Sequence, residues 1–387
     1  GRIGVTASEA ENIVGYEGND NLGSYYAWQG LFDYGWSNGT RPGATATSLE
    51  NRLVTWEKNG NLNTGIEATL FGGRLTTTIE YYNRYTRDML LNNPLAISSG
   101  FTGFDDNVGS MMNQGFEASF RGVIFERENF HWDATAMVSL NRNKVKEITS
   151  SQDVINYGSM VIEVGKPIYT FYMSKSAGVS PITGRQLYYA YYQYGVDENG
   201  AMVTERCPEY VTDNVGLASL SKYYYGSRQA LFSGSFASNF TIFKNFDLSF
   251  LTTYSVGGKV LDGLYDGAMN VTYAGNNWHR NKLRRWRKSG DITDVPMVEI
   301  GGSYASVGES LIDASYFAIK NITFGYTIPS KVMSKAKIKS FRVFFTADNI
   351  ALFSHLGGMD PQYNFAGTVS YSYSPSRVLA LGLDINF

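Results

Sequence analysis

The sequence predicts an all-β fold, namely an antiparallel β-barrel that crosses a membrane with its strands. Three observations support this prediction. Apolar and polar residues alternate over long stretches, short turns join these stretches in pairs, and the segments between pairs are long. The alternation is clearest at the chain end, 376–387, where one face carries Leu379, Leu381, Leu383, Ile385 and Phe387. Such a strand can also pack on a soluble core. The lengths of the loops therefore have to distinguish a membrane barrel from a soluble β-sheet protein.

The composition fits a barrel. Of the 387 residues, 18% are charged and 15% are aromatic, with 28 Tyr and 23 Phe. Outer-membrane barrels combine aromatic girdles with a polar lumen, so their mean hydropathy stays near that of soluble proteins. The value here is -0.22. The sequence has no run of about 18 apolar residues, so it predicts no transmembrane helix.

Charge and cysteine content exclude other classes. The net charge of -2 gives no reason to expect a nucleic-acid partner. The single cysteine, Cys207, excludes an internal disulfide framework and a cysteine-based zinc site. Residues 1–7 alternate like a strand and do not resemble a signal peptide, so we expect the chain to begin within the architecture.

Four hairpins of alternating strands are predicted. Residues 8–59 are rich in Gly, Asn, Ser and Tyr, and we expect one long loop there with some strand in it. The hairpins follow, and the closing strand comes after them. Their strands are 62–70 with 75–82, 116–124 with 132–141, 232–242 with 248–254, and 318–326 with 341–345.

The connections between the predicted strands fall into short turns within hairpins and long segments between hairpins. If the four hairpin turns lie on one side, the joining segments 87–114, 142–230, 257–314 and 351–375 lie on the other. Short periplasmic turns and long extracellular loops are typical of outer-membrane barrels. With uncertain strands near 2–7, 25–32 and 160–195, we expect about ten to twelve strands, whereas plugged transporters use about 22. The chain therefore looks like half a barrel whose closing strand runs inward.

Lys320 shares the predicted outward alternation of its strand. A lysine at mid-bilayer would cost roughly 2 to 4 kcal/mol. Its ammonium can reach an interface, or the strand inverts around it. Because Phe317 and Ile319 are apolar on the opposite face, we expect a local bulge or inversion.

Several stretches in order along the chain carry a family resemblance. They are TWEK (55–58) leading into NLNTGIE (61–67), FGGRL (71–75), EYYNRYTRDML (80–90), NVGSMMNQGFE (107–117), VGKPI (164–168), AGVSPITG (177–184), IKNITFGYTIP (319–329) and TADNI (346–350). Each stretch alone is a weak pattern of turn and strand residues. Together they resemble the SusC/RagA-type TonB-dependent transporters of Bacteroidetes outer membranes.

The resemblance implies a plugged 22-stranded barrel, of which residues 1–387 are the C-terminal part. The plug domain and the N-terminal strands are absent, and we expect residues upstream of Gly1 or another chain to supply the missing strands, because open sheet edges in lipid are untenable. Phe387 would be the aromatic signal for barrel assembly. The implied function is import of oligosaccharides, or alternatively oligopeptides, driven through TonB.

The resemblance also implies partners. They are a SusD-like lipoprotein lid, the TonB–ExbB–ExbD complex acting through the missing N-terminal part, the substrate and outer-membrane lipid, with transporter–lid pairs forming a dimer as a further option. An importer performs no covalent chemistry, and the sequence contains no H-E-x-x-H, P-loop or G-x-S-x-G motif. His131, His279 and His355 lie far apart without ligand spacing, so we expect no enzyme activity, cofactor or metal.

Candidate substrate contacts lie in the long loops. In the basic stretch 276–288, Trp278, His279, Arg285 and Trp286 could stack on sugars, bind an anionic substrate or bind single-stranded nucleic acid, the last of which the net charge does not favour. This stretch could equally be a loop fixed by the fold or one that touches lipopolysaccharide phosphates. Asp105 and Asp106, predicted at a loop tip, could bind sugar hydroxyls or form a solvated turn.

Aromatic runs offer further candidates. Tyr188 and Tyr189 begin the run 188–194, which with 223–225 could form a sugar-stacking platform, a lid contact or an extracellular girdle. Gln362, Tyr363 and Asn364 lie in the last long loop. Residues 197–200 resemble the start of a calcium loop, but later ligands are missing and a hairpin turn explains them better.

Two other classes of protein remain open at this stage. A surface adhesin or structural barrel would show the same strands without active transport. A soluble β-rich hydrolase would be recovered without detergent. The loops are generically polar and aromatic, so they do not distinguish a glycan from a peptide substrate.

Overall fold

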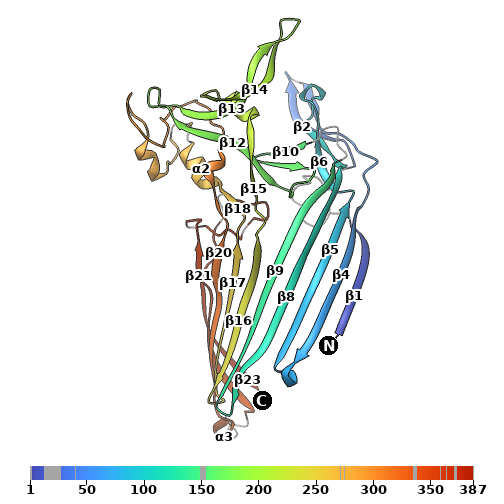
Figure 1. The fold of residues 1–387 in the computed structure, drawn as a ribbon, viewed down its shortest axis with the longest axis vertical. Helices are drawn as coiled ribbons and strands as arrows, with labels where there is room; N and C mark the ends of the chain where they lie inside the picture. Colours follow the sequence, from blue (N-terminus) through green and yellow to red (C-terminus); the bar gives the residue numbers. More distant parts are fainter. Residues whose placement is uncertain are drawn as a thin grey trace. The chain divides into compact units, whose positions relative to one another are not determined.

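The computed structural model describes residues 2–12, 28–39, 41–148, 154–270, 272–273, 275–333, 338–357, 359–362, 364–369 and 373–386. The chain forms two compact units (Figure 1). The first comprises Gly1–Glu126, Asp133–Tyr157 and Val161–Ile168, and the second comprises Arg127–Trp132, Gly158–Met160 and Tyr169–Phe387. Within the described ranges, no helix is both long and apolar enough to span a bilayer.

Ten long strands follow one another in a single antiparallel order, β1-β4-β5-β8-β9-β16-β17-β20-β21-β23. The prediction of an all-β fold is therefore confirmed. The strands are β1 (Arg2–Asn12), β4 (Glu57–Leu70), β5 (Leu75–Arg87), β8 (Gly109–Arg127), β9 (Phe130–Ile148), β16 (Phe232–Ile242), β17 (Phe246–Val256), β20 (Tyr316–Thr327), β21 (Ser340–Ser354) and β23 (Val378–Asn386).

Smaller sheets occupy the long connections. Two ribbons are β2 (Leu31–Asn38) with β3 (Arg41–Ser48) and β6 (Leu90–Pro94) with β7 (Gly103–Asn107). A six-stranded sheet contains β10 (Val154–Tyr157), β11 (Met160–Glu163), β12 (Thr170–Val179), β13 (Gln186–Val196), β14 (Met202–Thr212) and β15 (Lys222–Ser227). A three-stranded sheet contains β18 (Lys259–Asp262), β19 (Leu311–Asp313) and β22 (Thr368–Val369).

Helices are few and short. They are α1 (Val215–Leu220), α2 (Gly263–Met269) and α3 (Ser330–Met333), with 3-10 turns η1 (Phe71–Gly73), η2 (Ile97–Ser99), η3 (Arg280–Arg284) and η4 (Gly308–Ser310). Asn214 and Asp262 cap α1 and α2, because each side chain accepts a hydrogen bond from the third residue after it.

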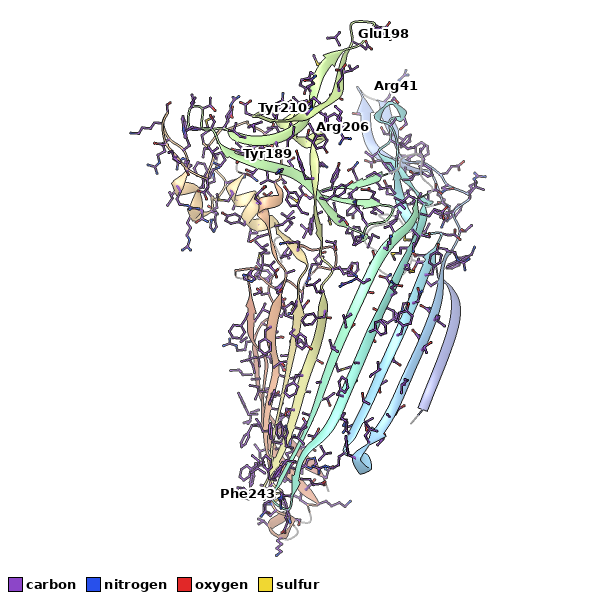
Figure 2. All side chains as sticks on the ribbon, in the orientation of Figure 1. Arg41, Tyr189, Glu198, Arg206, Tyr210 and Phe243 are labelled. Atoms are coloured by element: carbon purple, nitrogen blue, oxygen red, sulfur yellow. The ribbon has the colours of Figure 1, made fainter. Side chains whose placement is uncertain are left out.

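All four predicted hairpins are confirmed, as is the closing strand β23. At the β16–β17 turn, Phe243 and Lys244 both have positive φ, the backbone geometry that a tight two-strand connection requires (Figure 2). Two predictions need correction. The first strand continues to Asn12, so the predicted loop at 8–59 begins later. Of the strand candidate near 25–32, residues 25–27 lie outside the described residues and only Leu31 and Phe32 belong to a strand, β2. This strand and those within 160–195 belong to separate small sheets, because their partners lie within the same long connection.

The strand register assembles an apolar face in each unit. In the second unit, adjacent rows cross four strands on this face. The rows are Phe250–Ile322–Ala347–Leu379 and Leu248–Phe324–Phe345–Leu381. In the first unit, Ile66 pairs with Ile79, and Tyr81 pairs with Phe116 with ring centroids 5.0 Å apart. Many of these side chains are exposed, as a lipid-facing surface requires.

Lys320 lies in a β-bulge, as predicted. The pairing with β17 shifts between Leu251 and Thr252, and the pairing with β21 shifts between Ile319 and Asn321. Ile322, on the C-terminal side of the bulge, faces outward. Ile319, on its N-terminal side, also faces outward. The extra residue inverts the alternation, so apolar side chains continue along the same face on both sides of Lys320.

The opposite face is polar and hydrogen-bonded. Asn321 Nδ2 donates to Asp348 Oδ1 at 2.7 Å and to Thr346 Oγ1 at 3.0 Å. Arg342 forms two hydrogen bonds with the Asp247 carboxylate, Nε to Oδ1 at 3.0 Å and Nη2 to Oδ2 at 2.5 Å. Gly325 leaves room for this pair, because a Cβ there would lie 2.5 Å from Asp247 Oδ1.

Loss of this ion pair should destabilise the sheet. Asp247→Ala leaves the guanidinium of Arg342 without its two-point partner, and we expect the free energy of unfolding to fall by about 1 to 2 kcal/mol. Urea unfolding in lipid vesicles measures the change. Glu128→Ala is the control, since the Glu128–Lys244 pair is exposed and should contribute under about 1 kcal/mol. Equal losses in both variants would contradict this assignment.

Candidate functional site

Two surfaces of the six-stranded sheet gather candidate binding side chains. Strand β13 alternates, so Tyr188 and Tyr189 point to opposite faces. Tyr188 is only 1% exposed and packs with Ala218 and Ala305. Its ring is therefore not available for stacking, and only its hydroxyl reaches a pocket. Tyr189 lies on the other face and pairs with Val211 on β14 (Figure 2).

Tyrosines from three strands meet around Tyr191, whose hydroxyl lies 3.5 Å from that of Tyr172. We define the tyrosine cluster as Tyr172, Tyr189, Tyr191, Tyr223 and Tyr224. Tyr191 and Tyr223 meet edge to face at 5.5 Å, and Tyr172 stacks on Tyr224 at 4.7 Å. Lys175 Nζ lies 4.4 Å from the Tyr189 ring centroid and 5.1 Å from that of Tyr223. The sequence prediction of an aromatic assembly from runs 188–194 and 223–225 agrees with this arrangement.

Hydroxyl hydrogen bonds fix these rings. Tyr191 donates to the Lys222 carbonyl at 2.6 Å, and Tyr223 donates to Glu209 Oε2 at 2.6 Å. Burial raises the pKa of both phenols well above the ordinary value, and a nearby carboxylate, Glu209, adds to the rise at Tyr223. Both phenols therefore stay protonated and keep donating. A fixed aromatic surface loses little conformational entropy when a ligand binds.

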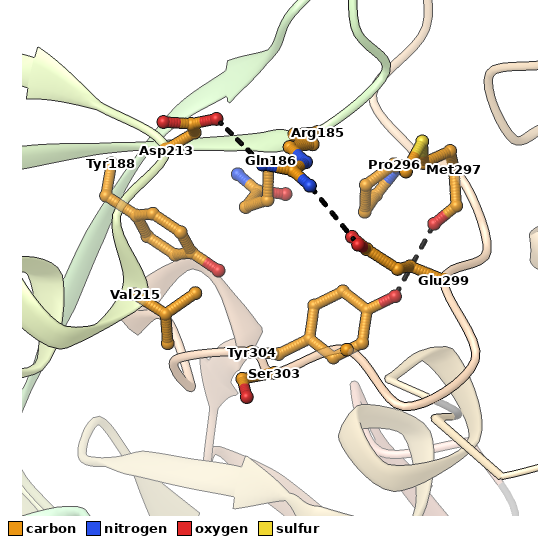
Figure 3. Close-up of a pocket in the computed structure, with 11 residues that line it drawn as sticks. Arg185, Gln186, Tyr188, Asp213, Val215, Pro296, Met297, Glu299, Ser303 and Tyr304 are labelled. Atoms are coloured by element: carbon orange, nitrogen blue, oxygen red, sulfur yellow. Dashed lines mark hydrogen bonds and ion pairs between the residues drawn. The ribbon is translucent and has the colours of Figure 1, made fainter.

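The other side of β13 borders a pocket of about 190 Å³ (Figure 3). Arg185 lies at its rim between two carboxylates, with Nη1 3.5 Å from Asp213 Oδ2 and Nη2 3.2 Å from Glu299 Oε1. The hydroxyl of Tyr188 accepts a hydrogen bond from the Ala305 amide at 3.3 Å. Tyr304 donates to the Met297 carbonyl at 3.4 Å and forms the facing wall.

A packed turn positions the pocket. Gly184, with φ of 73°, ends the turn after Pro181, and a Cβ there would collide with the Trp286 ring. Trp286 Nε1 donates to the Pro181 carbonyl at 3.0 Å, and the Met297 amide donates to the Gly184 carbonyl at 2.8 Å. These contacts tie segment 286–297 to the start of β13. Trp286 is thus held by the fold, one of the alternatives that the sequence left open.

Other residues in and beside the basic stretch make local hydrogen bonds. His279 Nδ1 accepts from the Asn281 amide at 3.2 Å and caps η3, while its ring meets Tyr265 edge to face. Asp291 Oδ2 accepts from the amides of Arg287 and Lys288. The exposed candidate is Trp278, which is 40% exposed and lies 5.8 Å from the Arg285 guanidinium. These residues remain predicted contacts.

Lys282 is an unexpected feature of this stretch. Its side chain is 1% exposed, and its ammonium has no hydrogen-bond partner among the described residues. The Tyr304 ring lies 5.7 Å from Nζ. Burial lowers the pKa of Lys282 to about 8, with a smaller contribution from the neighbouring charge of Arg285.

The predicted position of Asp105 and Asp106 at a loop tip is wrong. Both lie within strand β7, paired with β6, because the chain turns earlier at 95–102. Asp106 Oδ1 accepts from Asn51 Nδ2 at 3.0 Å, so this carboxylate joins two segments. Burial raises the pKa of Asp105, and its hydrogen bond to Asn92 partly opposes that rise. A substrate role for either residue remains a prediction.

The last loop is internally bonded where it is described. Gln362 donates through its backbone and side-chain nitrogens to Asp360 Oδ1 at 2.8 and 2.9 Å. Asn364 Oδ1 accepts from the Ala366 amide at 2.7 Å. Tyr363 and Phe387 lie outside the described residues. Of the described residues in this loop, neither Gln362 nor Asn364 lines the pocket of Figure 3.

Residues 197–200 form the β13–β14 hairpin turn, as predicted. Asp197 Oδ1 accepts from the amides of Asn199 and Ala201, and Gly200 has φ of 80°. Within the described part of the chain, no group of three or more His, Cys, Asp or Glu side chains is placed to hold a metal ion.

Sequence reasoning missed most of the pocket. Arg185 and Glu299 lie 114 residues apart in the chain, and no spacing or motif connects them. The PITG turn at 181–184 did mark the place where β13 begins, but it gave no indication of the acidic partners. Only tertiary contacts bring Asp213, Glu299 and Tyr304 to Arg185.

The antiparallel strands, their single apolar face and their tight turns define an outer-membrane β-barrel protein. No family model matches the chain. It is 24% identical over 369 residues to TonB-dependent receptor P3 of Formosa agariphila, covering 89% of this chain and 36% of that protein. It is 26% identical over 388 residues to TonB-dependent receptor SusC of Bacteroides thetaiotaomicron, covering 96% and 37%.

A solved structure agrees with these relatives. The RagAB peptide transporter structure matches with a TM-score of 0.78 and 25% identity, covering 100% of this chain and 40% of that chain. This chain is therefore similar in sequence and fold to SusC/RagA-type TonB-dependent receptors, and the resemblance predicted from its motifs is confirmed. It spans 36 to 40% of the length of these proteins.

Proposed function

We propose that this chain is part of an outer-membrane importer that takes up oligosaccharides and is driven through TonB. The observation that carries the proposal is the match of the whole chain to a solved transporter, at a TM-score of 0.78 and 25% identity. The tyrosine cluster supports an oligosaccharide, because flat apolar sugar faces stack on fixed aromatic rings. An importer binds and releases its substrate unchanged, so no enzymatic step is included.

Peptide import is the second candidate. Solved structures with high similarity are those of the RagAB peptide transporter and of the RagAB peptide importer in its closed-closed state. Backbone amides and carbonyls of a peptide would be recognised by the amide and hydroxyl groups in the long loops, with little dependence on side chains. The two substrate classes require the same transport mechanism.

Partners are part of the proposal. The relatives include SusC, and the chain is similar to the solved RagAB peptide transporter, so we propose a surface lipoprotein of the SusD type as a lid on the extracellular side. Energy would come from the TonB–ExbB–ExbD complex through a plug domain outside these residues. An adhesin or structural barrel would need neither component.

Uptake by cells that carry the full-length protein tests the proposal. We expect accumulation of fluorescent oligosaccharides to stop when a protonophore collapses the proton gradient and when the gene is deleted. Unlabelled oligosaccharides should compete with the probe, whereas a mixed peptide digest should not. Competition by the peptides alone would favour the second candidate. Surface binding that persists without a gradient and without internal accumulation would contradict the importer proposal.

A further inference from the structure

The pocket in Figure 3 differs from the tyrosine cluster in its chemistry. Its wall combines two carboxylates, one guanidinium and two phenol groups around about 190 Å³. That volume is smaller than the usual range for a drug-sized ligand, roughly 300 to 1,000 Å³. The pocket therefore suits a single ring or a single side chain of an oligomer.

Tyr188 gives the pocket a buried donor. Its hydroxyl accepts from the Ala305 amide at 3.3 Å, and its own proton has no acceptor among the residues that the structure describes. The side chain is 1% exposed, yet the hydroxyl points into the pocket. Burial raises the pKa of Tyr188, so the phenol remains a donor at neutral pH. A buried donor without an acceptor costs free energy that a ligand oxygen would recover.

The carboxylates supply acceptors. Arg185 contacts Asp213 through Oδ2 and Glu299 through Oε1, so each carboxylate retains a second oxygen. Arg185 lies between both groups and partly neutralises them. Vicinal hydroxyls of a sugar both donate and accept, and this set of two acceptors and one buried donor matches them.

We infer that this pocket is a subsite for one neutral monosaccharide ring, held by the Tyr188 hydroxyl and the Asp213 and Glu299 carboxylates. The ring would be one unit of the imported oligomer or part of a glycan on the cell surface. The inference rests on the proposed function only for the source of the sugar. Arg185 is a positioning residue, because it acts through the two carboxylates.

The net negative charge of the pocket suggests a cationic ligand as the alternative to a sugar. The pocket carries one more carboxylate than guanidinium, so a lysine side chain of a peptide is the main rival. Two features disfavour this rival. Arg185 lies between the carboxylates, where a second cation would be repelled. The Tyr188 hydroxyl proton would also find no acceptor on an ammonium, which is donor only.

Saturation-transfer NMR on the full-length transporter in detergent micelles tests the inference. The probes are methyl glucoside, methyl galactoside and methyl mannoside at millimolar concentration, with N-acetyl-lysine methylamide as the rival. We expect ring protons of at least one glycoside to be saturated. Tyr188→Phe, which keeps the buried ring, and Glu299→Gln should each reduce that signal at least about fivefold, a loss of roughly 1 kcal/mol.

Glu205→Gln on β14 of the same sheet is the matched control and should leave the signal unchanged. Near-ultraviolet circular dichroism of each variant checks that the sheet remains folded. The inference is overturned if no glycoside is saturated, if all variants give equal signals, or if only the lysine probe responds. Failure of the proposed function is distinguished by the uptake assay, since a glycoside can bind here without any gradient-dependent import.

Discussion

Phe250→Arg should destabilise the folded protein in a bilayer by about 2 to 4 kcal/mol. Phe250 lies midway along β17 on the apolar face, beside Ile322, and its ring contacts Phe236 and Phe240 at 5.8 and 6.2 Å. An arginine near the bilayer midplane carries that cost in outer-membrane barrels. The loss of the aromatic contacts adds to it. Reversible urea unfolding in lipid vesicles measures the change.

The neighbouring residue provides the control. Ser249 lies on the opposite face of β17, paired with Thr323, which takes part in polar hydrogen bonds. Ser249→Arg introduces the same side chain one position away, and we expect a change under about 1 kcal/mol because that face is polar. If both variants lost the same stability, the assignment of an apolar lipid face and a polar inner face would be wrong.

Lys282→Met should stabilise the segment around η3 by about 2 kcal/mol at pH 7. Lys282 has its pKa lowered from 10.5 to about 8, so the folded state is penalised for carrying the charge. Below about pH 8, Lys282 is protonated in both the folded and the unfolded state. The folded state then bears the full free-energy cost of burying the charge. Between about pH 8 and 10.5 the folded state loses the proton first, so the stability of the parent protein rises with pH.

Amide hydrogen exchange of Lys282 and Trp286 measures this local stability. Their amides donate to the His279 and Val295 carbonyls, and parent and variant are compared at the same pH. The advantage of Lys282→Met should shrink as the pH approaches 10.5. Exposed Lys288 provides the control variant, Lys288→Met, which should change little. Faster exchange in Lys282→Met at pH 7 would contradict the account by revealing a stabilising partner of the ammonium.

The alternation of apolar and polar residues was enough to predict most of the fold. The hairpins were predictable because each long strand has a single apolar face, and the charged residue Lys320 revealed the bulge where that face changes parity. The small sheets in the connections were not predictable in the same way. Their strands, such as β6 and β7, are short, and their partners are set by tertiary contacts rather than by a periodic pattern.

The candidate sites were predictable only where a local sequence pattern forms them. Tyrosine runs indicated the tyrosine cluster, since a run of aromatic residues on a strand must place several rings on one face. The alternation that makes this cluster also buries Tyr188, which the sequence had grouped with Tyr189. Acidic groups of the pocket come from distant segments, so no local pattern predicts that Glu299 meets Arg185.

The accessibility of strand β23 tests the central claim, that the alternating apolar face contacts outer-membrane lipid. Single cysteines at positions 379–384, placed in a Cys207→Ser background and spin-labelled in vesicles, report oxygen and nickel-chelate accessibility. We predict oxygen access at Leu379, Leu381 and Leu383, and chelate access at Ala380, Gly382 and Asp384. Equal accessibility to the chelate along the whole strand would contradict an outer-membrane barrel.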